Sequence, residues 1–373
     1  MFNELKLFFV NWRNGLVGSH RFQKWAGNTP VVRAIARKDG EKIYDLMAGF
    51  VYSQTLLAMV ELDIFNHLKG RSLTAVALSQ KVGVPEKNMI ILCQSATAIN
   101  LLERLNFGQY ALSRLGASVL GVPGLIDMIR HHRLFYEDLI DPVSLLKNKV
   151  DTHMSKYWPY VLNKTSQKPL KPEVAEIYSD LMRSSQKLVA EETLRLISFS
   201  RTKHLLDIGG GTGAFIEEVS KVTSGISFCL FDLPQVVDKA RKLTLRKENA
   251  NNFDVYGGSF VTDKIPKGFD TITLIRVLYD HDDHIVTMLL KKIYDSLPKN
   301  GQIIISEPMS GGKFPTRSGD SYFGFYTMAM TTGRPRSAEI HEFFLRKAGF
   351  QNIKKHKGTR EFITQVITAK KKF

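Results

Sequence analysis

The segment Arg276–Asp283 (RVLYDHDD) gathers side chains that could exchange protons. It follows a short apolar run and places a tyrosine, a histidine and three aspartates in its last five residues. A metal site needs ligands that converge, whereas successive side chains at the end of one strand diverge, so we expect no metal. Asp282 and Asp283 suit the N-cap and first turn of the helix that follows. Tyr279 and His281 remain as candidate acid/base groups.

These two residues would act at different stages of a proton transfer. Tyr279, with an ordinary pKa of about 10, is expected to be neutral at pH 7 and to position a hydroxyl or relay its proton. His281 has an ordinary pKa near neutrality and is better matched as the final proton acceptor. An exposed loop histidine would leave the same signal in the sequence.

A second histidine candidate lies in the segment Leu125–Leu139, whose periodicity predicts a helix. Met128, His132 and Tyr136 recur there at i, i+4 spacing and share one face. This would turn His132 toward a substrate cavity and His131 elsewhere. A core histidine with satisfied hydrogen bonds would show the same spacing.

An aromatic, methionine-rich stretch near the C-terminus suggests where a long apolar molecule would lie. Such side chains line apolar pockets, although an ordinary core uses the same residue types. With two residues of the histidine-bearing helix, the predicted substrate-pocket residues are Met128, Tyr136, Tyr322, Phe325, Tyr326 and Met330.

The segment Leu205–Phe215 (LLDIGGGTGAF) has the form of a strand, a glycine turn and a helix start. Gly209, Gly211 and Gly213 remove side chains where the backbone must bend sharply and approach a ligand closely. A dinucleotide-binding pattern is also satisfied, through Gly209, Gly211 and Ala214, so the glycines alone do not choose the ligand.

The acids around this loop favour S-adenosylmethionine over NAD. Asp207 ends the strand before the loop, where a carboxylate suits an ammonium and a sulfonium better than a pyrophosphate. Asp232 ends the second strand, 19 residues after Gly213, and can accept hydrogen bonds from both ribose hydroxyls. Phe260, after the third strand, can pack on the adenine. The predicted cofactor-binding residues are Asp207, Gly209, Gly211, Gly213, Asp232, Leu233, Ser259, Phe260 and Arg276.

The elements that must position these residues follow an α/β pattern. From His204 onward, short apolar strands alternate with helical segments, which is typical of a parallel, doubly wound sheet. Residues 352–355 and 362–369 are expected to add an antiparallel pair. Before residue 196 the periodicity is mainly helical, and Ser72–Ser113 has the outline of a winged helix. Its second helix is too apolar to read a DNA groove, so we expect no nucleic-acid partner.

Composition places the chain among ordinary globular proteins with a basic surface. The 373 residues are 43% hydrophobic, and 52 Lys+Arg against 36 Asp+Glu give a formal net charge of +16, which favours polyanionic partners. Two distant cysteines predict no disulfide framework and a reducing, cytoplasmic location. The N-terminal apolar run, Leu7 to Val10, is too short for a signal peptide or membrane span.

The N-terminal segment carries an aromatic stripe at helical spacing. Lys6 and Arg13 lie off this stripe, which suits either a helix docked on protein or an interfacial membrane helix. With the basic surface, the stripe predicts peripheral contact with an anionic membrane. The residues of the stripe are Phe2, Leu5, Phe8, Phe9 and Trp12.

Several motifs together resemble one enzyme family. LLDIGGGTG, FDLP, YGGSF, RVLYDHDD and ISEP follow, in this order, a helical domain that contains VELDIFNHL. From about residue 45 to the C-terminus, the chain resembles the two-domain small-molecule O-methyltransferases that include plant caffeate methyltransferases. Within that family, RFQKWAG, AGFVYSQ and GDSYFGFYTMAMTTGRPR are similar to stretches of the bacterial demethylspheroidene or hydroxyneurosporene O-methyltransferases.

The resemblance implies a Rossmann-like class I methyltransferase domain and an N-terminal all-helical winged-helix domain that forms a homodimer. It also implies no metal. By position, Gly209 matches the glycine that contacts the methionine part of the cofactor, and Asp232 matches the ribose acid. Ser259 and Phe260 match the adenine-side pair, although the family usually has Asp in place of Ser259.

The catalytic positions depart from the plant pattern. Tyr279 stands where the plant enzymes place their histidine base. Glu307 matches one carboxylate that orients this base, whereas Pro335 replaces the second. Two of the three groups of the plant-type base mechanism are therefore replaced in this sequence.

We expect a helical domain over residues 1–190 and a catalytic domain over 191–373. The predicted reaction moves a methyl group from S-adenosylmethionine to the tertiary hydroxyl of a 1-hydroxycarotenoid, leaving S-adenosylhomocysteine. A tertiary alcohol gives up its proton less readily than a phenol, so alignment should supply most of the acceleration. Alternative acceptors are a bacteriochlorophyll precursor or a phenolic metabolite. Alternatives from other classes are an NAD-dependent oxidoreductase and a winged-helix DNA-binding regulator.

Overall fold

The computed structural model describes residues 2–157, 172–244 and 252–372. The chain divides into two compact units, Met1–Ser118 and Val119–Phe373. The sequence placed a boundary at residue 190, whereas this division falls earlier. The reason lies in packing, because α8 (Leu125–Asp138) contacts α15 (Gly324–Met330) and α11 (Pro172–Leu196) contacts α12 (Ala214–Val222), all within the second unit.

The first unit contains the expected winged helix. Helix α5 ends where Gly83 adopts a left-handed φ of 71°, and α6 starts after Pro85. The strands form an antiparallel sheet in the order β1-β3-β2. The turn Asn106–Gly108 joins β2 to β3. The elements are α1 (Phe2–Val17), α2 (His20–Asn28), α3 (Pro30–Glu61), α4 (Ile64–His67), β1 (Leu73–Thr74), α5 (Ala75–Val82), α6 (Glu86–Ala98), β2 (Leu102–Arg104) and β3 (Gln109–Leu112), followed by α7 (Arg114–Gly121), which contains the boundary.

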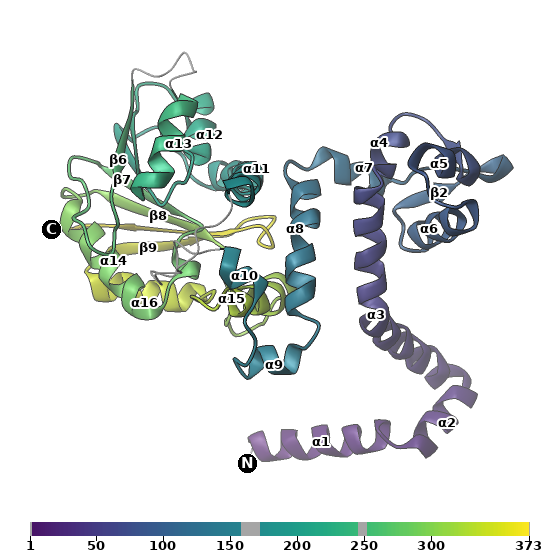
Figure 1. Ribbon diagram of the computed structural model, residues 1–373. Helices are drawn as coiled ribbons and strands as arrows, with labels where there is room; N and C mark the ends of the chain where they lie inside the picture. Colours follow the sequence, from purple (N-terminus) through teal and green to yellow (C-terminus); the bar gives the residue numbers. More distant parts are fainter. Residues whose placement is uncertain (1, 158–171, 245–251, 373) are drawn as a thin grey trace. The chain divides into compact units, whose positions relative to one another are not determined.

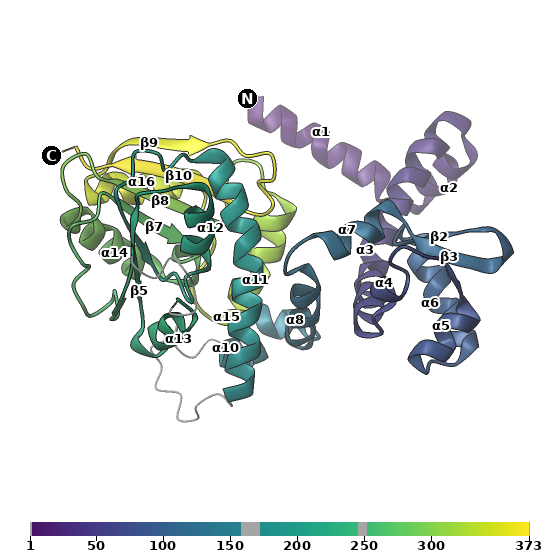
Figure 2. The ribbon, with the colours of Figure 1, turned by 90° about the horizontal axis from the view of Figure 1, so that it is seen from above.

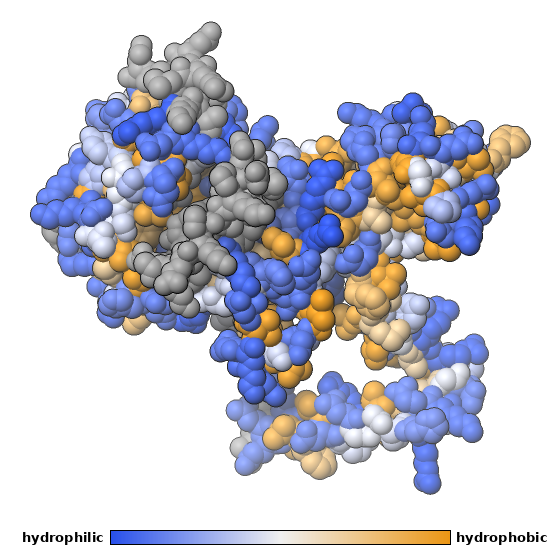
Figure 3. Space-filling model, in the orientation of Figure 1, coloured by the Kyte–Doolittle hydropathy of each residue, from blue (hydrophilic) through white to orange (hydrophobic). Residues whose placement is uncertain are grey.

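The N-terminal helices expose much apolar surface. Leu5, Phe8, Phe9 and Trp12 on α1 are 57–64% exposed, and Figure 3 shows apolar side chains interleaved with polar ones along α1 and α3. Of the described residues, only those of α3 form a helix long and apolar enough to cross a membrane, and 22% of its most apolar window is buried. Length and composition alone are weak grounds for a membrane span.

The second unit is built on a seven-stranded sheet in the order β6-β5-β4-β7-β8-β10-β9. The neighbouring strands β6, β5, β4, β7 and β8 run parallel to one another. Strand β10 is antiparallel to both of its neighbours, β8 and β9, so the expected C-terminal antiparallel pair is confirmed. The strands are β4 (His204–Ile208), β5 (Ser227–Asp232), β6 (Phe253–Gly257), β7 (Thr271–Ile275), β8 (Gln302–Glu307), β9 (Gln351–His356) and β10 (Gln365–Lys370).

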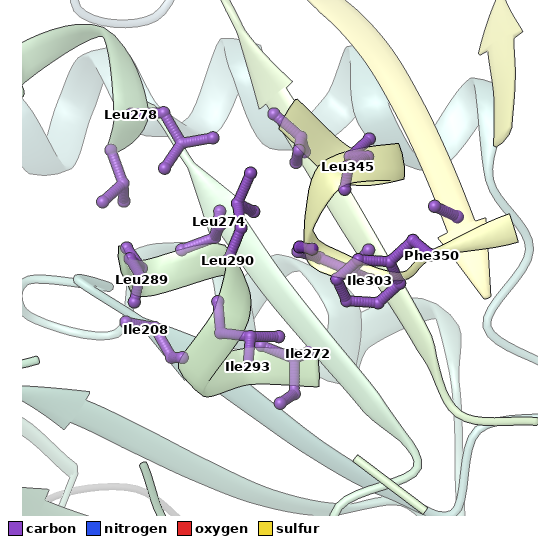
Figure 4. Packing of buried hydrophobic residues seen from close by; sticks show 14 of the residues in the cluster. Ile208, Ile272, Leu274, Leu278, Leu289, Leu290, Ile293, Ile303, Leu345 and Phe350 are labelled. Carbon is purple, nitrogen blue, oxygen red and sulfur yellow. The ribbon is translucent and has the colours of Figure 1, made fainter. Parts of the chain in front are cut away.

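Helices cover both faces of this sheet, as expected for a doubly wound fold (Figures 1 and 2). On one face, α11, α12 and α13 (Pro234–Thr244) pack around Phe215 and Leu230. On the other, α14 (Asp283–Ser296) and α16 (Ala338–Ala348) pack around Leu274, Leu290 and Leu345, as Figure 4 shows. Because both faces are buried, β5 and β8 contain continuous apolar runs, Phe228–Phe231 and Ile303–Ile305, rather than alternating ones.

A third cluster lies within the same unit, where α8 contacts α15. It contains Phe135, Tyr326 and Met330, and α10 (His153–Tyr157) also contacts α15. The short helix α9 (Pro142–Leu146) adds Leu145. This cluster holds the aromatic residues that the sequence suggested for a substrate pocket.

Candidate active site

A cavity of about 570 Å³ opens at the carboxyl ends of the parallel strands, where ligands bind in open α/β sheets. Its wall comes from the turns after β4, β5, β6 and β7 and from a segment that precedes α16. Among the residues that line the cavity are Gly209, Gly210, Gly211, Asp232, Leu233, Ser259, Phe260, Arg276, Tyr279, Asp280, His281 and Thr332.

The glycine loop needs its glycines for two physical reasons. Gly209, Gly211 and Gly213 have φ of 68°, 60° and 82°, a region that disfavours other residues. A Cβ on Gly210 would lie 2.3 Å from Oδ2 of Asp207. Gly209 and Gly211 line the cavity, whereas Gly213 serves as the N-cap of α12 and does not.

Asp207 lies behind this loop rather than on the cavity wall. It is fully buried, and its Oδ1 accepts a 2.6 Å hydrogen bond from Oγ1 of Thr273. Burial raises the pKa of Asp207 to about 7, although that hydrogen bond opposes the rise. The side chain therefore supports the underside of the loop in this structure.

Asp232, in contrast, borders the cavity and ties two turns together. Its Oδ2 accepts from the backbone N–H of Gly211 at 2.8 Å, and its Oδ1 accepts from that of Leu233 at 2.7 Å. Burial raises the pKa of Asp232 to about 6, and both hydrogen bonds oppose this rise. Each carboxylate oxygen keeps a further lone pair for a donor in the cavity.

The turn after β6 forms another part of the wall through Ser259 and Phe260. The backbone N–H of Ser259 donates to Asp263 at 2.8 Å, and the Phe260 ring meets His281 edge-on, with centroids 5.1 Å apart. Lys292 on α14 donates to the carbonyls of Phe260, Val261 and Asp263 at 2.8–2.9 Å. The turn is thereby fixed by a lysine that the sequence analysis did not single out.

Arg276 follows β7 with a φ of 59°, an uncommon conformation for a residue with a side chain. Such strained residues concentrate at functional sites. Its Nη1 donates to Oγ of Ser185 on α11 at 2.9 Å. Arg183, from the same helix, also lines the cavity and pairs with Glu217 at 2.6 Å; it was missed because α11 carries no motif.

Glu307 holds the turn that presents Tyr279. This fully buried carboxylate accepts the backbone N–H of Leu278 at 2.8 Å and that of Tyr279 at 3.3 Å, and His341 Nε2 lies 3.1 Å from its other oxygen. Tyr279 lines the cavity, and burial is the largest cause that raises the pKa of its phenol. The tyrosine is therefore neutral at pH 7.

His281 also lines the cavity, on the side of Phe260. Burial lowers its pKa to about 4, so the imidazole is neutral at pH 7 and a weak base. An ordinary pKa was expected from the sequence, because burial of this loop cannot be read from RVLYDHDD. Asp282 accepts the N–H of Ile285 at 3.0 Å, which confirms the expected N-cap of α14.

The segment 276–283 is locked by two groups that sequence reasoning missed. Arg336 is fully buried and donates to the carbonyls of Leu278 at 2.8 Å and His281 at 2.6 Å. Gly333 packs so closely that a Cβ there would lie 2.1 Å from the carbonyl oxygen of Tyr279. The motif GRPR contains both residues, but nothing in it names their distant partners.

His132 and the predicted substrate-pocket residues do not line this cavity. His132 Nε2 lies 2.7 Å from the Tyr322 hydroxyl, and His131 Nε2 lies 2.9 Å from that of Tyr326. Both histidines thus bond to tyrosines, and His131 does not point elsewhere as the spacing suggested. Tyr326 and Met330 are buried in the third cluster, and Met128, Tyr136, Tyr322 and Phe325 are half-buried.

This third cluster nevertheless reaches the cavity wall through aromatic contacts. Phe323 meets Tyr279 with ring centroids 6.0 Å apart and Tyr322 at 4.9 Å. Burial lowers the pKa of both histidines, to about 4 for His131.

Within the described residues, no group of three or more His, Cys, Asp or Glu side chains is arranged to hold a metal ion.

Comparison with known proteins assigns the family. Residues 136–351 match the O-methyltransferase domain, and residues 44–137 match the O-methyltransferase dimerisation domain. The chain therefore belongs to the two-domain O-methyltransferases, and the dimerisation domain supports a homodimer.

Two curated relatives extend over nearly the whole chain. The chain is 42% identical to demethylspheroidene O-methyltransferase of Cereibacter sphaeroides, covering 95% of this chain and 93% of that protein. It is 41% identical to the protein of the same name in Rhodobacter capsulatus, over 97% and 90%.

Solved structures share the fold at low identity. Human N-acetylserotonin methyltransferase in complex with SAM superposes with a TM-score of 0.70 at 21% identity, covering 90% of this chain and 98% of that one. The S-adenosylmethionine-dependent methyltransferase SibL, in its apo form, gives 0.76 at 20%, over 89% and 99%. The class I methyltransferase fold expected from the sequence is confirmed.

Proposed function

We propose that this O-methyltransferase transfers the methyl group of S-adenosylmethionine to the tertiary hydroxyl of a 1-hydroxycarotenoid. The observation that carries the acceptor is the identity of 41–42%, over nearly full length, to two demethylspheroidene O-methyltransferases. The fit of the cavity to a nucleoside supports the methyl donor, because glycines that allow close approach, the carboxylate of Asp232 and the ring of Phe260 all line the cavity.

Within this proposal, the glycine loop and three turns hold the cofactor. Gly209 and Gly211 allow close approach, Asp232 accepts the ribose hydroxyls, and Leu233, Ser259 and Phe260 enclose the adenine. Asp207 and Gly213 shape the loop from behind. Arg276, which donates to Ser185, fixes the cavity wall between the cofactor and the acceptor. When bound, S-adenosylmethionine supplies an electrophilic methyl group on a sulfonium.

Tyr279 is proposed to position the acceptor hydroxyl from its neutral phenol, in a turn that Glu307 holds in place. His281 closes the adenine side through Phe260. His132 and its aromatic neighbours form the apolar wall along which a polyene would lie, reached through Phe323. Orientation of the reactants is a main source of rate in such a site.

The acceptor class is tested by comparing substrates with one enzyme preparation. Purified protein with labelled S-adenosylmethionine should methylate extracted 1-hydroxycarotenoids in detergent, and should leave chlorophyllides and catechols unmethylated. S-adenosylhomocysteine should raise the melting temperature, whereas NAD should not. Methylation of the catechol in preference to the carotenoid would contradict the acceptor.

A peripheral contact between α1 and an anionic membrane is proposed as the route to such an acceptor, with the protein otherwise in the cytoplasm. The exposed stripe Leu5, Phe8, Phe9 and Trp12 supplies apolar area, and the formal net charge of +16 supplies attraction. Replacing Phe9 and Trp12 by serine should reduce binding to phosphatidylglycerol vesicles about tenfold, while Asn11→Ala should not. Equal binding by all three proteins would contradict this contact.

A further inference from the structure

Two buried polar atoms on residues that line the cavity have no hydrogen-bond partner among the described residues. They are Oδ1 of Asp280 and Oγ1 of Thr332, and both residues line the cavity. Unpaired buried polar groups are costly and therefore rare in folded proteins. A pair of them on one cavity wall indicates a ligand that satisfies both.

The backbone brings these two residues together. Asp280 follows Tyr279 in the turn after β7, and Thr332 precedes Gly333. A Cβ on Gly333 would lie 2.4 Å from the carbonyl carbon of Asp280 and 2.6 Å from the backbone nitrogen of His281. The segment 331–333 is thus seated directly on the turn that carries Asp280.

The chemistry of the pair is complementary to an alcohol. A carboxylate oxygen can only accept a hydrogen bond, and the hydroxyl of Thr332 can donate one. A ligand hydroxyl needs an acceptor for its proton and has lone pairs that accept a donor. A methyl ether product has no proton to donate, so an ionised carboxylate at Asp280 would hold it less well.

We infer that Asp280 and Thr332 hold the acceptor hydroxyl and that Asp280 takes its proton during methyl transfer. This inference rests on the proposed function and assigns the part played by histidine in the plant enzymes to a neighbouring carboxylate. The O–H bond breaks and its proton goes to Asp280, while the oxygen uses an electron pair to bond the methyl carbon. The C–S bond breaks, its electrons return to sulfur, and Asp280 later releases the proton to solvent.

The surroundings of Asp280 suit a carboxylate that works as a base. Arg276 lies on the same turn and stabilises the ionised form, whereas Glu307 on β8 opposes ionisation. Tyr279 and Tyr326 are the phenols near it, and both stay neutral. Burial raises the pKa of Asp280 well above its usual value, and a more basic carboxylate is better matched to an alcohol proton.

The test compares Asp280→Asn, Thr332→Val and Thr332→Ser with the wild type, using hydroxycarotenoid methylation. Asp280→Asn should lower kcat by roughly 100-fold or more, the usual share of a general base, with KM within about threefold. The rise of kcat/KM with pH, above the ordinary carboxyl range, should disappear. Thr332→Val should raise KM by roughly tenfold, the effect of one lost hydrogen bond, and Thr332→Ser should restore it.

Asp295→Asn is the control. It also replaces an aspartate by asparagine, but this exposed residue of α14 pairs with Lys291 and does not line the cavity, so kcat should stay within about threefold. A melting-temperature rise with S-adenosylhomocysteine in every variant shows that the fold and the cofactor side are intact. If Asp280→Asn loses this rise, Asp280→Glu must bind S-adenosylhomocysteine and keep the pH-dependent rise of kcat/KM.

The failures are distinguishable. A wild type that methylates no hydroxycarotenoid contradicts the proposed function. A wild type that is active, with an Asp280→Asn variant that matches its kcat and pH profile, overturns the role of Asp280 alone. Unchanged KM in Thr332→Val overturns the part of Thr332.

Discussion

The two sides of the cavity are built in different ways. The side proposed for the cofactor uses backbone: glycines that allow close approach and N–H groups oriented by Asp232. The side proposed for the acceptor uses side chains whose positions depend on distant segments, since Glu307 and Arg336 hold the turn of Tyr279 and Asp280. A fold can therefore keep the first side constant while the second changes with the acceptor.

The substitution with the largest expected effect, Gly210→Ala, disturbs the side proposed for the cofactor and leaves the side proposed for the acceptor in place. Gly210→Ala would put a Cβ 2.3 Å from Asp207 and 2.5 Å from Leu230, so the loop must shift away from its ligand-binding position. Affinity for S-adenosylhomocysteine should fall roughly 100-fold, equivalent to about 2.7 kcal/mol and within the cost of overpacking a core. Isothermal titration measures it.

Gly312→Ala is the control for this loss. A Cβ at Gly312 meets nothing within 4 Å and needs no left-handed φ, so its affinity should equal that of the wild type. Normal binding by Gly210→Ala would show that the loop does not need this close approach.

The complementary change disturbs the acceptor side alone. Gly333→Ala combines a φ of 64° with a Cβ contact of 2.1 Å to the carbonyl oxygen of Tyr279, which must displace Thr332 or the Tyr279 turn. We expect kcat to fall by roughly 30-fold, because small misplacements at a reacting centre are costly. S-adenosylhomocysteine affinity should stay within about threefold. Loss of both properties together would mean that the two sides are not independent.

The difference between the two sides also explains what the sequence could predict. The glycine loop, Asp232 and the alternation of strands with helices come from local signals: spacing, apolar runs and the residues at strand ends. The winged helix was equally readable from its turn, Val82–Pro85. These features rest on residues close together in the chain.

The acceptor side could not be predicted to the same degree, because its determinants are contacts between distant residues. The pairing of Arg336 with Leu278 and the seating of Gly333 on Tyr279 join segments more than 50 residues apart. Asp280 was treated as one acid in a polar run, since burial and a missing partner are invisible in sequence. The lowered pKa of His281 has the same origin.

A smaller effect on cofactor affinity is expected from changing Asp207, and it tests whether this carboxyl lies behind the loop or beside the cofactor. Since this carboxyl lies behind the loop, Asp207→Asn should keep S-adenosylhomocysteine affinity within about threefold. A role beside the cofactor's ammonium would instead cost more than tenfold. Titration of the variant against the wild type separates the two.

The same variant should change how stability depends on pH. The folded-state pKa of Asp207, about 7, lies above its ordinary value of 3.8, so its contribution is present below pH 3.8 and is lost as pH rises through 7. Asparagine does not ionise, and the variant should therefore gain a few degrees in melting temperature over the wild type between pH 5 and pH 8. A melting-temperature difference between variant and wild type that stays the same from pH 5 to pH 8 would contradict the shifted pKa.

The smallest expected effect lies furthest from the cavity wall. His132 bonds to Tyr322 at 2.7 Å and is separated from Tyr279 by Phe323, so it should shape the apolar wall without exchanging protons. His132→Gln keeps a hydrogen-bonding side chain, and kcat should change by no more than about twofold with the pH profile unchanged. KM for a full-length hydroxycarotenoid should respond more than KM for a short tertiary alcohol, because only the long polyene reaches this cluster. A tenfold loss of kcat for both acceptors would move the proton path from Asp280 to the histidines of α8.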